Sequence, residues 1–128
     1  MSAGKNRAYL PCALMECPPL DDETFRRIVH LLLILGMLFL LDIVTTQVIL
    51  RMGGVELNPL MAGIVANPLL HLGVKSAIIL VIFPVSLIAE QQVKGSSSFV
   101  YCILIPLYIF IVVNNLFVIL PQIIAGSA

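Results

Sequence analysis

Charged side chains are scarce in this chain. Only 11% of its 128 residues are Asp, Glu, Lys or Arg, whereas 60% are hydrophobic. Soluble domains usually carry about 25% charged residues, so there are too few charges here to cover a globular surface. A lipid bilayer is therefore the expected partner. The formal net charge is zero and no basic run occurs, which leaves no electrostatic basis for nucleic-acid binding.

Cysteine and histidine are also too few to indicate a metal centre. Cys12 and Cys17 have a C-x4-C spacing, which is not that of a zinc knuckle, and no second pair or nearby His completes a site. We expect two unlinked thiols there, and we expect Cys102 to pack within an apolar helix. His30 and His71 lie near the ends of apolar runs, where an interfacial position is favoured over metal ligation. The sequence thus predicts no metal and no cofactor.

Three long apolar runs cover about residues 28–50, 69–89 and 99–120. Each is long enough to span, because about 20 residues that each add about 1.5 Å cross a hydrocarbon core about 30 Å thick. We predict an all-α integral membrane fold with three transmembrane helices. Residues 1–27 are expected to form a polar N-terminal tail and residues 28–128 the transmembrane helical domain. No A-x-A cleavage site follows the first run, so we expect it to remain as an anchor.

A short interrupted segment, residues 55–70, separates the first two runs. It is apolar but too short to span the membrane. Asn58-Pro59 and Asn67-Pro68 each resemble a helix start, because Asn caps helices and Pro is favoured at the first helical position. We therefore predict a short re-entrant or interfacial helix of about two turns between spans one and two.

Prolines and basic residues mark the expected bends and the orientation. Pro84 is expected to kink the second span, residues 90–98 to form a polar turn, and Pro121 to end the third span.

Positive charges near span ends favour the cytoplasmic side. Arg26, Arg27 and Lys94 fall on one side, and Arg51 and Lys75 fall on the other. This difference in positive charge predicts a protein integral to the cell membrane, with its N-terminus cytoplasmic and its C-terminus outside.

The polar groups of the three spans are expected at one depth. Asp42 lies eight residues before Leu50, about 12 Å below the outer end of span one. Lys75 lies six residues into span two, about 9 Å below the same surface, and Asn115 lies five residues before the end of span three, at about 8 Å. A lone charge at such depth costs on the order of 2.5–3.5 kcal/mol. Pairing between Asp42 and Lys75 would reduce that cost.

We predict a buried polar cluster around these residues. Glu56 competes with Asp42 for Lys75, and the sequence leaves both pairings open. Asn115 is favoured over Asn114 as the inward amide because it shares a helical face with Tyr108. Alternatively, such side chains serve only as association glue, worth about 0.6 kcal/mol each, and Thr hydroxyls can bond their own helix carbonyls. The predicted members are Asp42, Thr45, Thr46, Glu56, Asn58, Lys75 and Asn115.

These residues also carry a family resemblance. The chain resembles a prokaryotic domain-of-unknown-function family of small integral membrane proteins with an Asp…Thr…Gly…Glu-x-Asn-Pro signature and a downstream Lys. The resemblance covers about residues 28–120 and leaves the N-terminal tail outside. It implies a three-span fold and no established activity. The matching residues here are Asp42, Thr45, Thr46, Gly53, Gly54, Glu56, Asn58, Pro59 and Lys75.

The favoured function is non-catalytic: a structural or assembly subunit of a membrane complex or homo-oligomer. Three spans bury little surface alone. The pairs Gly73/Ala77 and Ala62/Ala66 have the small-xxx-small spacing that lets helices approach closely.

The first alternative is proton, ion or small-solute transport by an oligomer, through Asp42, Glu56 and Lys75. A broken helix with charge at membrane depth is typical of transporters. Against it, three spans are few for a carrier and no inverted repeat is visible.

The second alternative is a membrane enzyme acting on lipid, with Asp42 and Glu56 as an acid–base pair. No nucleophile–base motif, His-rich zinc set or phosphate loop accompanies these acids. The sequence therefore predicts no catalytic residues and favours a protein that is not an enzyme.

Overall fold

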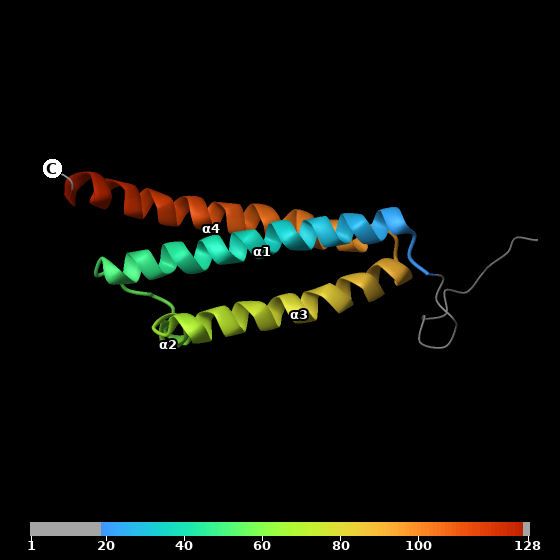
Figure 1. Cartoon of the computed structure of the whole chain (residues 1–128), viewed down its shortest axis with the longest axis horizontal. Coiled ribbons are helices and arrows are strands. Elements are labelled where there is room, and N and C mark those ends of the chain that lie inside the picture. Colours follow the sequence, from blue (N-terminus) through green and yellow to red (C-terminus); the bar gives the residue numbers. More distant parts are fainter. Residues whose placement is uncertain (1–18, 127–128) are drawn as a thin grey trace, which may run out of the picture.

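The computed structural model describes residues 19–126, which form four helices and no strand. In chain order these are α1 (Asp22–Arg51), α2 (Pro59–Val65), α3 (Pro68–Gln92) and α4 (Ser96–Gly126). The helices α1, α3 and α4 are each long and apolar enough to cross a membrane. They run alongside one another, with α2 beside the start of α3 (Figure 1). The predicted all-α fold, with three spans and a short helix between the first two, is confirmed.

The first helix begins before the predicted span. Asp21 caps α1 by accepting a hydrogen bond from the backbone N–H of Thr24 at 3.2 Å. Hydrogen bonding from Thr24 also lowers the pKa of Asp21 below its ordinary value. Two acids in the first turn are favoured there by the helix dipole. The helix ends at Arg51, and Gly53 then takes a φ of 90°, a conformation that glycine adopts without steric cost.

The two Asn-Pro pairs start helices as predicted. The side-chain oxygens of Asn58 and Asn67 each accept a hydrogen bond from the backbone N–H two residues later, at 3.1 and 3.0 Å. Each Asn is therefore the N-cap of the helix that follows it. Gln47 of α1 donates through Nε2 to the carbonyl of Val65 at 2.7 Å. This bond ties the end of α2 to the last turns of α1.

Prolines do not end the later spans. Pro84 lies inside α3, and Pro106 and Pro121 lie inside α4. The prediction that Pro121 ends the third span is wrong, because α4 continues to Gly126. A proline inside a helix removes one backbone hydrogen bond. Membrane helices tolerate that loss where local adjustments satisfy the freed carbonyl.

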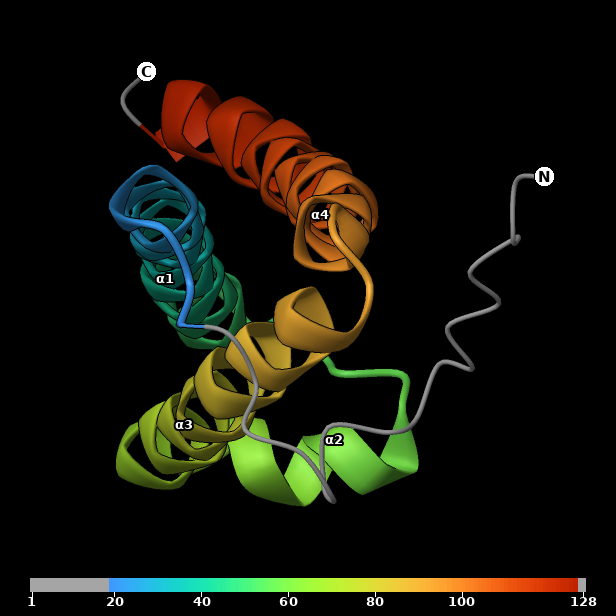
Figure 2. The same ribbon diagram turned by 90° about the vertical axis from the view of Figure 1, so that its right-hand side faces the viewer.

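The helix α1 supplies most of the core because it packs against both other spans, more extensively against α4 than against α3. The end-on view shows the three long helices with α2 packed beside α3 (Figure 2). Ile28, Leu35 and Phe39 of α1 form a buried cluster with Tyr101 of α4. Most other large hydrophobic side chains are exposed, as expected for side chains that contact lipid.

The cysteine predictions have different outcomes. Cys102 is exposed on α4, so the prediction that it packs inside is wrong. A lipid-facing thiol has the same apolar surroundings as a packed one, which explains why hydrophobicity alone did not distinguish them. Cys12 and Cys17 lie outside the described residues.

Candidate functional site

Asp42 and Lys75 form an ion pair inside the bundle. Lys75 Nζ, from α3, lies 2.9 Å from Asp42 Oδ2, in the middle of α1. The side chains of Lys75 and Asp42 are only 8% and 9% exposed. Of the two acids that the sequence left open, Asp42 is the partner of Lys75. The pairing offsets part of the cost of holding each charge away from water.

Two aromatic rings enclose the ammonium group of Lys75. Its Nζ lies 4.8 Å from the ring centroid of Phe39 and 4.5 Å from that of Tyr108, within the range of a cation–π interaction. It also donates to the hydroxyl of Tyr108 at 3.3 Å. The two rings contact each other, with centroids 4.5 Å apart. The charge of Lys75 is therefore held by side chains from both α1 and α4.

Asn115 connects α4 to the same place. Its Nδ2 donates to Thr45 Oγ1 at 3.1 Å and lies 3.5 Å from Asp42 Oδ1. Thr45 in turn donates through Oγ1 to the carbonyl of Leu41 at 2.8 Å. All three long helices thus meet at one set of contacts. The predicted cluster members joined here are Asp42, Thr45, Lys75 and Asn115, which we call the polar layer.

Three other predicted members lie beside the polar layer and are not joined to it. Glu56 Oε1 accepts from the backbone N–H of Asn58 at 3.0 Å, and the side chain of Asn58 caps α2. Each of these two side chains is therefore engaged by the backbone N–H two residues later. Thr46 and Glu56 line a small cleft of about 130 Å³ that reaches Asn115. This cleft is their only connection with the polar layer among the contacts of the described residues.

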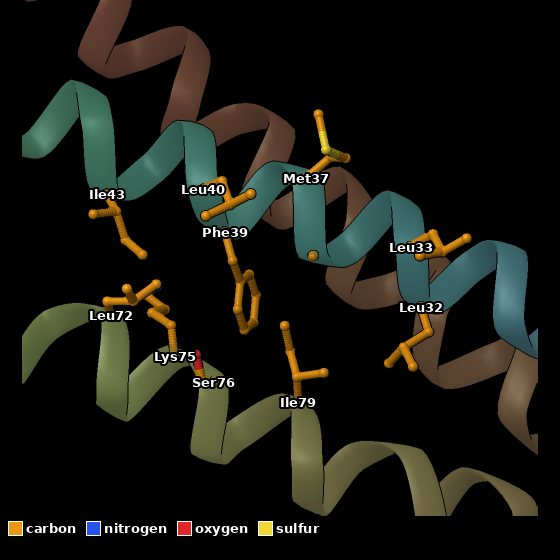
Figure 3. Close-up of a pocket in the computed structure, with 11 residues that line it drawn as sticks. Leu32, Leu33, Met37, Phe39, Leu40, Ile43, Leu72, Lys75, Ser76 and Ile79 are labelled. Carbon is orange, nitrogen blue, oxygen red and sulfur yellow. The ribbon is translucent and has the colours of Figure 1, made fainter. Parts of the chain in front are cut away.

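An apolar groove of about 580 Å³ lies between α1 and α3. Phe39 points from α1 towards α3, and Lys75 and Ser76 are the polar residues in a lining that is otherwise apolar (Figure 3). The ammonium of Lys75 is engaged by Asp42 and Tyr108. The groove therefore offers apolar contact rather than an array of catalytic groups.

His71 is a buried residue whose position the sequence did not predict. It is 1% exposed, and neither ring nitrogen has a hydrogen-bond partner. It lies one turn before Lys75 on the same face of α3, so its ring is buried among the helices although the residue lies near the start of the span. The charged groups that act on it electrostatically are Asp42, Glu56 and Lys75. Within residues 19–126, no three His, Cys, Asp or Glu side chains gather in a way that could hold a metal ion.

A second polar cluster lies where α3 meets α4. Glu90 is 4% exposed and accepts hydrogen bonds from the backbone N–H groups of Gly95 at 2.8 Å and Ser97 at 3.1 Å. The Ser97 hydroxyl also donates to it, and Arg27 of α1 lies 3.7 Å away. We call Glu90, Ser97 and Arg27 the turn cluster. Sequence reasoning treated this stretch as a polar turn, although a negative charge close to a helix N-terminus is favoured by the helix dipole.

One family model matches the chain. It is described as Domain of unknown function (DUF5658), and it matches residues 33–121. The matched segment begins inside α1 and ends inside α4, so it contains α2 and the whole polar layer. No curated protein and no solved structure matches the chain. Because the match covers well over half of the sequence, the chain belongs to the family described as Domain of unknown function (DUF5658).

Proposed function

We propose that the chain is a structural or assembly subunit of a membrane complex or homo-oligomer. The closed pairing of the polar layer is the observation that supports this most. Lys75 is matched by Asp42 and Tyr108, and Asp42 is matched in turn by Asn115. Sites that bind or transform a substrate place polar groups so that they converge on an open pocket. The charged groups here point at one another, as expected for groups that hold helices together.

The outer surface of the bundle supports assembly. The three spans expose large apolar side chains over most of their length. On α3, Gly73 is exposed with open space where a Cβ would be, and Ala77, one turn later, is also exposed. Small residues at this spacing let the backbone of another helix approach closely. The spans are therefore suited to packing against further helices.

The charge distribution supports an N-terminus in the cytoplasm and a C-terminus outside the cell membrane. Arg26 and Arg27 lie near the start of α1, and Lys94, in the turn after α3, lines the same cleft as Arg27. Arg51 lies at the opposite end. Lys75 is paired inside the bundle, so it does not count among the loop charges that set orientation. Without Lys75, the excess of positive charge at the end of the bundle that holds Arg26, Arg27 and Lys94 is larger than the count from the sequence indicated.

Native mass spectrometry of the full chain, released gently from its source membrane, tests the assembly proposal. We expect a homo-oligomer or a complex of fixed stoichiometry with a defined partner. Cross-linking in the intact membrane before release is the control for dissociation in detergent. A chain that remains monomeric in both experiments contradicts the proposal.

A second candidate function is proton, ion or small-solute transport by an oligomer. The observation that favours it is the buried ring of His71, which lacks hydrogen-bond partners beside an acid–base pair. Intramembrane titratable groups of this kind occur in proton relays. Transport predicts a pH-dependent flux in reconstituted vesicles that Asp42→Asn abolishes. The subunit proposal predicts no flux from the chain alone.

A further inference from the structure

The helix α4 carries two adjacent asparagines at the depth of the polar layer, in very different surroundings. Asn115 donates to Thr45 and reaches Asp42. Asn114 is exposed, and its side chain makes no hydrogen bond to another residue within 19–126. Successive helix residues point about 100° apart, so Asn114 cannot join the same contacts. Lipid offers an amide no hydrogen-bonding partner, which makes such an exposed group costly.

The apolar residues around Asn114 follow the spacing of a coiled-coil seam. Ile103, Leu107, Phe110, Asn114 and Phe117 are separated alternately by four and three residues, the pattern of a and d positions. The four apolar side chains are between 50% and 71% exposed. We call these five residues the outer α4 face. A seam of this kind is expected to pack against another helix.

We propose that the outer α4 face docks a second copy of this chain, with the two α4 helices parallel and the two Asn114 side chains hydrogen-bonded to each other. The proposal rests on the assembly function and names its contact surface. Copies inserted in the same direction place Asn114 at the same depth. Because an amide is both donor and acceptor, an identical amide satisfies it. A single Asn at an a position is known to fix register and oligomeric state.

The composition of α4 favours a second copy over a different partner. No Asp, Glu, Lys or Arg lies between Ser96 and Gly126. Two copies can therefore approach without like-charge repulsion, and the face has no charge that would select an oppositely charged partner. The inner face of α4 already packs on α1, so a self-contact through the outer face leaves the bundle intact.

Energy transfer between labelled full-length chains in lipid vesicles, measured over a range of protein-to-lipid ratios, tests the proposal. We expect wild-type dimers, and we expect Asn114→Leu to weaken the dimerisation constant by about 3- to 30-fold, the range for one interhelical hydrogen bond in a membrane. Asn114→Gln retains donor and acceptor and should lose less. Val113→Leu, beside the face, is the matched control. A dimerisation constant unchanged in Asn114→Leu overturns the proposal.

Cysteine cross-linking gives the geometry independently. In a chain whose Cys12, Cys17 and Cys102 are replaced by Ser, Phe117→Cys should form disulfide-linked dimers. Leu116→Cys, exposed on a different side of α4, should not. Equal cross-linking at both positions contradicts the parallel seam.

The outcomes separate this proposal from the assembly function. A homo-oligomer that is insensitive to Asn114→Leu refutes the outer α4 face and leaves the assembly function in place. If the chain is monomeric in vesicles but native mass spectrometry finds a defined partner, the outer α4 face is likewise refuted and the assembly function stands. Monomers in vesicles with no partner in the source membrane refute both.

Discussion

The polar layer and the turn cluster each contain a buried acid, but the two acids are stabilised by different kinds of group. Asp42 is held by side chains from two other helices, Lys75 of α3 and Asn115 of α4. Glu90 is held mainly by the backbone N–H groups of Gly95, in the turn after its own helix, and of Ser97, in the first turn of α4. An acid in mid-span depends on distant partners, whereas an acid at the end of a span has local donors. The bundle should therefore tolerate changes at its turn better than changes at its middle.

Among these variants, removal of Lys75 should lower the free energy of unfolding of the bundle most. Lys75→Met leaves Asp42 without its counter-charge, and breaking a buried pair in this way costs about 3–5 kcal/mol. The free energy of unfolding in bicelles, followed by circular dichroism, measures the loss. Lys94→Met, at the exposed turn, is the control with the same substitution and should change stability little. A loss in Lys75→Met no larger than in Lys94→Met would contradict the comparison.

Removal of Glu90 should destabilise the bundle less than removal of Lys75. Glu90→Ala leaves the N–H groups of Gly95 and Ser97 without their acceptor, a loss of about 1–3 kcal/mol that nearby water at the turn can reduce. The same unfolding measurement applies, with the exposed Gln92→Ala as control. If Glu90→Ala destabilises the bundle more than Lys75→Met, the ranking of the two clusters is reversed.

A substitution at Gly95, in the turn between α3 and α4, should destabilise the bundle less than the loss of Glu90. Gly95 has a φ of 89° and open space where a Cβ would lie. Gly95→Ala should therefore cost only the conformational penalty, about 1–2 kcal/mol. Gly63→Ala is the matched control, because Gly63 also has open space but a helical backbone, where Ala is favoured. Equal stability of the two variants would show that the turn is not constrained as described.

The partly exposed ion pair between Arg27 and Glu90 should contribute least to the stability of the bundle. Arg27 lies 3.7 Å from Glu90, but its side chain is 52% exposed. Solvent and salt screen such pairs, so Arg27→Gln should cost less than about 1 kcal/mol. The difference from wild type should shrink further in 0.5 M salt. A larger loss that persists at high salt would place Arg27 among the main supports of the turn cluster.

The polar layer could be predicted because helix geometry is regular. A uniform rise per residue placed Asp42, Lys75 and Asn115 at one depth, and helical periodicity selected Asn115 over Asn114. Glu56 and Asn58 could not be placed in this way. They lie in the loop before α2, where Glu56 accepts from the N–H of Asn58 and Asn58 caps α2, so neighbouring backbone groups engage both side chains.

The turn cluster was missed for a related reason. The stretch that contains Glu90 has the composition of a solvated turn, whereas α3 in fact continues to Gln92 and α4 restarts at Ser96. Only that tight connection places the Glu90 carboxylate beside the backbone N–H groups of Gly95 and Ser97. His71 illustrates a different limit. Its position in the sequence suggested the membrane surface, but its place on the Lys75 face of α3 buries it.

The central claim is that Asp42 and Lys75 hold the bundle together as a pair, and a double-mutant cycle tests it most directly. Unfolding free energies are measured for wild type, Asp42→Leu, Lys75→Met and the double variant, with Asp42→Asn as a polar control. We expect each single variant to be strongly destabilised, and the double variant to be more stable than Lys75→Met alone, because no unpaired charge remains. If the losses add to within about 0.5 kcal/mol, or if Asp42→Leu is as stable as Asp42→Asn and wild type, the claim is wrong.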